Sequence, residues 1–510
     1  MKKFFARIPN WVWLMIFVLL AAVQIYWLRN VVMGDAFIHF VFARGIAEGQ
    51  PFFYNGQFSA GSTSPLWSIL LAPFWQIFGL KIIWVVKILA GFFAALAIFL
   101  TFGVANKISR NRVAALITAG LLTTSFVLPY WAAKGMETPL FVCLVLAAFW
   151  IYLKILETRK TFWLEVLLGI ILGFAILTRP EAWFLSLFLG LALLVQKKWR
   201  AILTIGLPAF LIFAPYYFWL FANTGSIFPS SMARILRARQ WAHEFGGVYF
   251  TLEITKILLT KFLPLIPFFV FFFFSPFNPP LKWSVKFPIF AWLIFHAIFF
   301  SVIFPTTEGY RYILAALPFF YLIAVLGIFR LPKKWITPIL VLGVLGSLAI
   351  TGQQFFERRT AIANCEQPFL DQTRRETGEW IAENTGPNDL IAMKEIDQSA
   401  FYGGRRMLSL DGTLDTRAIE FVQSNDQLQF LKNEKPNYFI LEEEMYREYP
   451  DWKNSNLLPL ADNELKTGDT KTLDGVEFIL LQKIKVGDPQ SCPQFSQEYF
   501  WWIFEVKFAQ

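Results

Sequence analysis

The chain has 510 residues, 56% of them hydrophobic, with 58 phenylalanines and a mean hydropathy of +0.50. This composition excludes an ordinary water-soluble globular protein and places the chain in a lipid bilayer. The formal net charge of +10 does not indicate nucleic-acid binding, because the Lys and Arg residues form short clusters between apolar runs and do not gather in one patch.

The first apolar run, residues 11–28, is expected to be a retained membrane span and not a signal peptide, because it is long and aromatic and no small-residue cleavage site follows it. A helix needs about 20 apolar residues to cross the hydrocarbon. The sequence contains about eleven such runs: 11–28, 82–104, 113–129, 139–156, 162–178, 182–196, 201–221, 257–275, 287–304, 313–329 and 335–352. The predicted fold class for residues 1–352 is therefore an all-α polytopic membrane bundle.

Charged residues predict the orientation of this bundle. Basic clusters occupy alternate connections: Lys2/Lys3/Arg7, Lys107/Arg110/Arg112, Lys154/Arg159/Lys160, Lys197/Lys198/Arg200, Lys282/Lys286 and Arg330/Lys333/Lys334. Lys and Arg accumulate on cytoplasmic connections. We therefore expect a cytoplasmic N-terminus in a bacterial plasma (inner) membrane and, with an odd number of spans, an extracytoplasmic C-terminal part.

Acidic residues are scarce in the predicted bundle, where residues 1–352 hold nine of the 36. Seven of the nine fall on the predicted extracytoplasmic connections: Asp35, Glu48, Glu137, Glu181, Glu244, Glu253 and Glu308. Carboxylates at membrane edges are rare and usually functional, so this face is expected to carry a site.

Residues 353–510 hold the other 27 acidic residues and no run of membrane length. Helical patterns around 369–384, 415–424 and 426–433 alternate with strand-like runs at 390–393, 407–410, 438–441 and 476–482. This alternation predicts a soluble, extracytoplasmic α/β domain.

The first extracytoplasmic loop, residues 29–81, is too amphipathic for a disordered segment. Residues 36–48 are expected to form an interfacial helix, and 64–78 a more apolar one that dips into the bilayer without crossing it. Asp35 opens this loop after Gly34. A carboxylate held there can act as general base for an acceptor hydroxyl, and the alternative is a helix N-cap.

Several motifs together resemble the bacterial GT-C glycosyltransferases, the relatives of protein mannosyltransferases, aminoarabinose transferases and arabinofuranosyltransferases. The ordered series is 35–49 (DAFIHFVFARGIAEG), 54–56 (YNG), 61–67 (GSTSPLW), 135–140 (GMETPL), 178–181 (TRPE), 229–234 and 308–312 (EGYRY). The stretches at Asp397 and at Asp411-Gly412-Thr413 also resemble parts of the family's C-terminal domains, although Asp-Gly is a good turn in any protein.

The resemblance implies an inverting glycosyltransferase, a hexosyl- or pentosyltransferase that takes its sugar from a polyprenyl-phosphate donor. The acceptor would be a lipid-linked glycan, a protein or a cell-wall polymer. It also implies that Asp35 is the catalytic base. Many relatives carry two adjacent acidic residues at this position, whereas this chain has Gly34 before Asp35, which weakens the case for a metal bridging an acidic pair.

Further residues are candidates for substrate binding. Glu137 and Glu181 can accept hydrogen bonds from sugar hydroxyls, the alternative being ion pairs with Lys134 and Arg179. Arg234 and Arg311 match basic positions of the family pattern and are expected to bind the donor phosphate. For Arg237 and Arg239, contact with anionic lipid headgroups is a strong competing interpretation.

His39 lies four residues after Asp35, on the same helix face, where it could orient Asp35 or contact substrate; the alternative is an interfacial histidine without such a role. No further metal ligands can be named, so a divalent metal cofactor is unsupported. Cys365 and Cys492, near the two ends of the predicted extracytoplasmic domain, are expected to form a disulfide.

A polytopic transporter or lipid-glycan flippase is the alternative function. Transporters more often carry carboxylates or broken helices at the middle of the membrane. Here the charges lie at the ends of the predicted spans. The sequence has neither a Walker loop nor a dinucleotide-binding glycine fingerprint, so use of a nucleotide sugar is unsupported.

Overall fold

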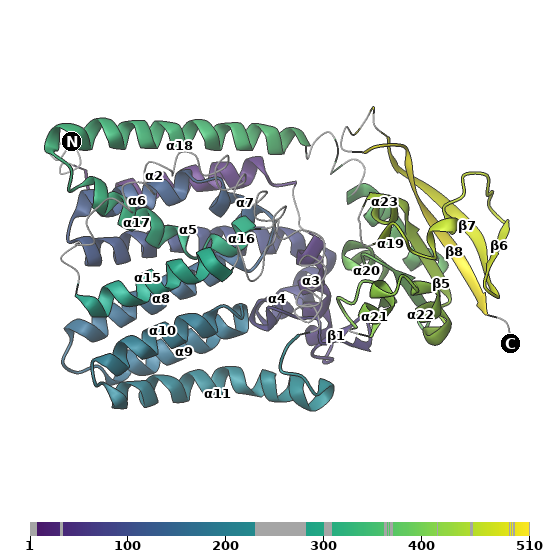
Figure 1. The fold of residues 1–510 in the computed structure, drawn as a ribbon, viewed down its shortest axis with the longest axis horizontal. Coiled ribbons are helices and arrows are strands. Elements are labelled where there is room, and N and C mark those ends of the chain that lie inside the picture. The colour runs from purple at the N-terminus through teal and green to yellow at the C-terminus, as the bar shows by residue number, and fades with distance from the viewer. Residues whose placement is uncertain are drawn as a thin grey trace. The chain divides into compact units, whose positions relative to one another are not determined.

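The computed structural model describes residues 8–30, 34–229, 282–299 and 309–508, apart from short gaps at 362–364, 366, 368–370, 416, 449–451, 489, 491 and 493–494 (Figure 1). These residues form two compact units. The helical unit comprises the described residues of 8–30, 83–219, 282–299 and 309–357, and the α/β unit those of 34–82, 220–229 and 358–508.

The apolar runs of the sequence form helices in the structure. They are α2 (Asn10–Trp27), α5 (Ile82–Ser109), α6 (Arg112–Thr124), α7 (Val127–Ala133), α8 (Thr138–Glu157), α9 (Phe162–Thr178), α10 (Ala182–Val195), α11 (Trp199–Thr224), α15 (Trp283–Ile298), α16 (Gly309–Ile313), α17 (Leu317–Ile328) and α18 (Lys333–Ala361). The predicted span 257–275 lies outside the described residues.

The predicted number of eleven spans is not confirmed. Among the described helices, five are long and apolar enough to cross a membrane, or six if α6 and α7, which are bent by 48° at their break, form one span. The helices α9, α10 and α17 are apolar but shorter. The polytopic character of the chain is thus supported, and the exact count is not.

Side-chain contacts tie the basic connections of the helical unit together. Lys107, after α5, pairs with Glu157 at the end of α8 (Nζ to Oε2, 2.6 Å), and Lys198 before α11 donates to the carbonyl of Ile155 (3.4 Å). Tyr152 of α8 donates to the carbonyl of Ser284 at the start of α15 (2.7 Å). The α8 helix has 20 residues, so its other end lies about 30 Å away along the helix axis.

Small residues let α9 and α11 approach closely in the helical unit (Figure 1). A Cβ atom at Gly169 would collide with the carbonyl oxygen of Ile205, and one at Gly173 would lie 2.8 Å from Cβ of Ile212. Such small-residue spacing is common where membrane helices pack backbone against backbone.

The α/β unit contains a six-stranded mixed sheet of order β4-β3-β5-β8-β7-β6 (Figure 1). The strands β4, β3 and β5 are parallel, and the others pair antiparallel. The strands are β3 (Leu390–Met393), β4 (Arg406–Ser409), β5 (Tyr438–Glu442), β6 (Thr470–Leu473), β7 (Val476–Gly487) and β8 (Tyr499–Phe508). Its helices are α19 (Gln372–Asn384), α20 (Asp397–Gly403), α21 (Ala418–Gln423), α22 (Gln427–Glu434) and α23 (Glu443–Glu448), with a 3₁₀ turn at Leu458–Leu460. The sequence predicted β3, β4, β5, β7, α19, α21 and α22, but not β6, β8, α20 or α23.

The first loop belongs to this same unit. It forms α3 (Gly34–Ala47), the hairpin β1 (Phe53–Tyr54) and β2 (Gln57–Phe58), α4 (Pro65–Phe78) and a 3₁₀ turn at Gly79–Lys81. Asn55 and Gly56 both have positive φ, 50° and 78°, as expected for the Asn-Gly turn of a two-residue hairpin.

Motif residues of the loop contact the C-terminal residues. Asn55 Nδ2 donates to the carbonyls of Ala400 (2.9 Å) and Arg405 (2.8 Å), and Arg44 Nη1 donates to the carbonyl of Phe401 (3.4 Å). A Cβ atom at Gly61 would lie 2.8 Å from the carbonyl oxygen of Thr413. Several residues of the family-like motif therefore contact α20 and the turns that follow α20 and β4.

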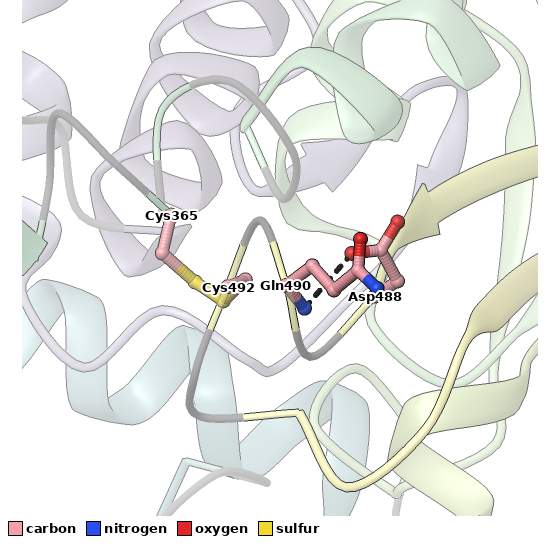
Figure 2. Close-up of a disulfide and its surroundings, with 4 residues drawn as sticks. All are labelled: Cys365, Asp488, Gln490 and Cys492. Atoms are coloured by element: carbon pink, nitrogen blue, oxygen red, sulfur yellow. Dashed lines mark hydrogen bonds between the residues drawn. A yellow bond between two sulfur atoms is a disulfide. The ribbon is translucent and has the colours of Figure 1, made fainter.

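A disulfide joins Cys365 to Cys492 in the α/β unit, with their Cα atoms 4.9 Å apart. This is the pair expected from the sequence. Figure 2 shows it beside the turn in which the backbone N–H of Gln490 donates to Asp488 Oδ1 (3.0 Å). The bond ties the segment before α19 to the segment between β7 and β8.

Candidate functional site

Asp35 lies in the first turn of α3, where the backbone N–H groups of a helix favour a negative charge. His39 follows one turn later and is buried, with Nδ1 hydrogen-bonded to Ser68 Oγ of α4 at 3.5 Å. Because α3 and α4 pack together, Ser68 lies close enough to His39 for this hydrogen bond to orient the imidazole ring. The structure thus places Asp35 and His39 on one helix of the α/β unit.

The other candidate residues sit at helix ends of the helical unit. Glu137 precedes α8 and follows Gly135, whose φ of 76° permits the tight turn before the helix. Arg179 ends α9, and Glu181 precedes α10 two residues later. Carboxylates at helix N-termini and a guanidinium at a helix C-terminus each interact favourably with the helix dipole.

These helix ends bring two carboxylates and two guanidinium groups into one ionic network. Arg179 Nη1 donates to Glu137 Oε1 (2.7 Å), and its Nη2 donates to Glu181 Oε1 (2.8 Å). Arg311, in the short helix α16, donates through Nη2 to the same Glu137 oxygen (3.1 Å). Glu137 therefore bridges two arginines that are 132 positions apart in the sequence.

The network is buried and lined by aromatic rings. The residue exposures are 1% for Glu137, 5% for Arg179, 7% for Glu181 and 6% for Arg311. The guanidinium of Arg179 lies 4.5 Å from the ring centre of Tyr312, and that of Arg311 lies 5.7 Å from the ring of Trp131. Desolvated charges must be paired, and the two positive and two negative charges of this network balance.

One carboxylate oxygen of the network remains available. Glu181 Oε2 is buried and has no hydrogen-bond partner among the residues that the structure describes. A buried acceptor without a partner costs free energy, so a hydroxyl donor at this position would be stabilising. The ion pair of Glu181 with Arg179 is the alternative that the sequence suggested for Glu181. Because this pair uses Oε1, Oε2 could still accept a hydrogen bond from a sugar hydroxyl.

Arg179 is the residue whose importance the sequence alone did not reveal. It appeared within the motif Thr178-Arg179-Pro180-Glu181 but only as a pairing partner of Glu181. In the structure it contacts both carboxylates. Lys134, an alternative ion-pair partner for Glu137 in the sequence, lies over the rings of Tyr130 and Trp131 (4.7 and 4.8 Å to their centres).

The remaining candidates divide as follows. Glu137, Glu181 and Arg311 are brought together in the helical unit, whereas Asp35 and His39 belong to the α/β unit. Arg234 lies outside the described residues, as do Arg237, Arg239 and Glu308. Within the part of the chain that the structure describes, no group of three or more His, Cys, Asp or Glu side chains is arranged to hold a metal ion.

Known proteins with a similar sequence or structure were found for this chain. A family model described as "Dolichyl-phosphate-mannose-protein mannosyltransferase" matches residues 62–219. The structure resembles that of ArnT from Cupriavidus metallidurans bound to undecaprenyl phosphate, with a TM-score of 0.61 and 13% sequence identity over 98% of this chain and 99% of that one. The chain therefore shares the fold of this structure over nearly the whole length of both chains.

Structures of an archaeal oligosaccharyltransferase have a similar fold. The Archaeoglobus fulgidus oligosaccharyltransferase tethered to an acceptor peptide has a TM-score of 0.60 at 12% identity, covering 98% of this chain and 74% of that chain. Its complex with an inhibitory peptide and a dolichol-phosphate, named AglB, has a TM-score of 0.57 at 12% identity, with 88% and 72% covered. Comparison with curated protein sequences gives no match.

Proposed function

We propose that this chain is a glycosyltransferase that moves a sugar from a polyprenyl-phosphate donor to an acceptor at the extracytoplasmic face of the membrane. The observation that carries the proposal is the shared fold, which extends over nearly the whole length of both this chain and ArnT bound to undecaprenyl phosphate. The mannosyltransferase family model and the dolichol-phosphate complex of AglB support the same donor chemistry.

In the proposed reaction Asp35 accepts the proton of the acceptor hydroxyl as the oxygen attacks the anomeric carbon. A new glycosidic bond forms, the bond between that carbon and the phosphate oxygen breaks, and polyprenyl phosphate leaves with the electron pair. Attack from the face opposite the phosphate inverts the anomeric configuration. A carboxylate in the first turn of a helix near the membrane surface suits the role of general base.

Arg311 is proposed to bind the donor phosphate and to stabilise the charge that develops on it. A guanidinium presents its N–H donors in a planar fork that matches the oxygens of a phosphate group. Glu137 would hold Arg311 in a fixed orientation, and Glu181 Oε2 would accept a hydrogen bond from a sugar hydroxyl. Arg234 is proposed as a second phosphate contact from its sequence position alone. No step of this mechanism passes through a metal ion.

The placement of charge supports surface chemistry over transport. Glu137, Arg179 and Glu181 lie at helix ends, not at mid-helix. Transporters commonly carry such groups near the middle of the membrane. Donor cleavage is the measurement that separates the two functions, since a flippase moves its lipid intact.

The test is incubation of the purified protein in lipid vesicles with a panel of polyprenyl-phosphate sugars and a mixture of membrane-derived acceptors. Release of polyprenyl phosphate from one donor, dependent on acceptor and lost in Asp35→Asn, is the expected result. If no donor is consumed and labelled lipid crosses the vesicle bilayer intact, the transporter function replaces the enzyme.

A further inference from the structure

The helix α4 of the α/β unit exposes an apolar side. Ile69 and Ile77 of α4 are 43% and 73% exposed, and Leu80, in the 3₁₀ turn that follows, is 52% exposed. Pro73 is exposed between them. Positions 69, 73 and 77 are four residues apart, so they lie along one side of the helix. The helix α4 contains no charged residue, and the first charge after it is Lys81.

The opposite side of α4 is fixed within the same unit, where α4 packs on α3 (Figure 1). Leu71 is fully buried, and Trp75 contacts Phe401 of α20 with ring centres 5.7 Å apart. Gln76 Nε2 donates to the carbonyl of Ala47 at the end of α3 (3.0 Å). One side of α4 therefore holds α3 and α20, and the other side presents apolar groups.

The chain connection places α4 beside a membrane span. Three residues, Gly79–Lys81, join it to α5, so the end of α4 lies within about 14 Å of the start of α5. The helix α4 has 14 residues, about 21 Å, and is too short to cross hydrocarbon about 30 Å thick. The helix α5, with 28 residues, is long enough to cross by itself. The end of α4 thus lies near the point where this crossing begins.

Two lysines of α5 indicate where the hydrocarbon starts. Lys87 donates to the carbonyl of Arg29, just after α2, and Lys107 pairs with Glu157 at the other end of the helical unit. The two lysines are 20 positions apart, which corresponds to about 30 Å of helix, the thickness of the hydrocarbon core. The residues just before Lys87 therefore lie in the interfacial layer, and α4 is connected to that layer.

Exposed apolar residues continue along the start of α5. Trp84, Ile88 and Phe92 are exposed and follow one another at intervals of four residues. Tryptophan is enriched at the membrane–water interface, where Trp84 is expected to lie. Lys81 is the single charged residue in the sequence between Ile69 and Trp84. An apolar environment shared by both helices accounts for the exposed residues of each.

We propose that the exposed side of α4 is a lipid-binding surface, which inserts among the acyl chains of the leaflet at the Ile82 end of α5 and holds the α/β unit on the membrane. The sequence predicted that residues 64–78 enter the bilayer, and the side of α4 that does so is assigned from the exposed residues. An amphipathic helix of this kind lies with its apolar side about 5–10 Å into the boundary between headgroups and acyl chains. Because α3 packs on the opposite side of α4, the helix that carries Asp35 would be held beside the lipid headgroups.

Spin labels on single cysteines test this proposal in vesicles of phosphatidylcholine and phosphatidylglycerol. In a Cys143→Ser background the other two cysteines are joined in the disulfide, so a nitroxide attaches only to an introduced cysteine. The ratio of oxygen to nickel-chelate accessibility should be about 5-fold higher for a label at Ile77→Cys than for one at Asp474→Cys, an exposed control in the same unit. Phe92→Cys, exposed on α5, gives the ratio for a label in hydrocarbon.

Two results of this measurement overturn the proposal. A ratio at Ile77→Cys equal to that at Asp474→Cys would place this side of α4 in water. Exclusion of both oxygen and the nickel chelate would mean that protein covers it, either another part of the chain or a second copy.

A photoactivatable lipid gives a second measurement, on the unaltered protein. Phosphatidylcholine with a diazirine near the carbonyl end of one acyl chain is added to the vesicles, and the labelled peptides are identified by mass spectrometry. Peptides from residues 65–80 should carry lipid, as should those from the start of α5, whereas peptides from α19 of the same unit should carry none. Label on α5 without label on α4 refutes the lipid contact. Neither measurement requires turnover, so both decide the proposal whether or not the proposed donor is consumed.

Discussion

At the scale of single residues, the helical unit stabilises four buried charges by pairing them. Glu137 accepts from both Arg179 and Arg311, and Arg179 spans Glu137 and Glu181. Removing one member leaves a buried charge without its partner, which costs several kcal/mol, typically about 3–5. A substitution in this network can therefore lower activity by destabilising the protein. A functional test at these positions needs variants that keep the charge.

Asp35→Asn should lower turnover by about 100-fold or more, because the amide keeps the size of the side chain but cannot accept a proton. Donor binding should persist. Rates of donor consumption and donor-binding titrations, measured on the same preparation in lipid vesicles, check both expectations. Glu48→Gln, an exposed carboxylate just after α3, is the matched control and should turn over as the parent. Parental turnover in Asp35→Asn would remove Asp35 from the mechanism and leave Glu137 as the next candidate.

Arg311→Lys should raise the donor concentration needed for half-maximal rate by about 10-fold, because Lys keeps the positive charge opposite Glu137 but loses the bidentate geometry that suits a phosphate. Steady-state rates at varied donor concentration give the value. Arg330→Lys, at an exposed position after α17, is the control. An unchanged donor dependence in Arg311→Lys would speak against a phosphate contact.

At the scale of elements, the placement of glycines decides which helices come into close contact. Gly169 of α9 faces a backbone carbonyl of α11, whereas a Cβ atom at Gly206 of α11 would meet nothing within 4 Å. In the α/β unit, buried carboxylates on the short helix α23 pair with the strand β8. Glu444 accepts from Trp501 Nε1 (2.9 Å), and Glu443 accepts from Trp502 Nε1 (3.3 Å).

Gly169→Ala should destabilise the protein by about 1–3 kcal/mol, because the added methyl group forces α9 and α11 apart. Thermal unfolding of the purified protein in one detergent measures the change. Gly206→Ala should be neutral or slightly stabilising, since Ala is a better helix former by about 1 kcal/mol. Equal stability of the two variants would show that the close approach of α9 and α11 does not contribute to the stability of the protein.

At the scale of the whole molecule, charge indicates how the helical unit is oriented in the membrane. Its basic connections are tied together by the contacts of Lys107, Tyr152 and Lys198, and the network around Glu137 begins at the other end of α8. The positive-inside rule assigns the basic end to the cytoplasm. The ionic network and the residues after 352 would then be extracytoplasmic.

Labelling of single cysteines in intact cells tests this orientation, in a Cys143→Ser background. A membrane-impermeant maleimide should label Asp474→Cys in intact cells, because this position is exposed in the α/β unit. Lys160→Cys, exposed between α8 and α9, should react only after the membrane is broken. The reverse pattern would invert the predicted topology.

Thiol counts test the disulfide. Denatured protein purified without reductant should show one thiol, from Cys143, and three after reduction, because the other two cysteines are bonded to each other. Closing a loop between residues 127 positions apart should stabilise the α/β unit by about 2–4 kcal/mol. Cys492→Ser should therefore unfold at lower denaturant concentration, whereas Cys143→Ser should keep its disulfide. Three thiols without reductant would contradict the pairing.

The sequence by itself determined the features that depend on local pattern. Apolar runs of sufficient length gave the helices, and α9, predicted at 162–178, has those bounds in the structure. The alternation of short elements after residue 352 predicted an α/β fold, and β3 was placed at its observed residues. The strand β8 was missed because it lies between β5 and β7 and its consecutive buried residues, Trp501 to Phe504, lack the alternation of a half-buried strand.

Only the tertiary structure decided which charged residues meet. Nothing local links Glu137 to Arg311 or Gly34 to Asp397, because these contacts form between residues more than 100 positions apart. Sequence spacing suggested Arg179 as an ion-pair partner of Glu181, which the structure shows, but it did not suggest that Arg179 and Arg311 both contact Glu137. Burial requires each charge to find an opposite charge in space, and the packing of helix ends determines which one it finds.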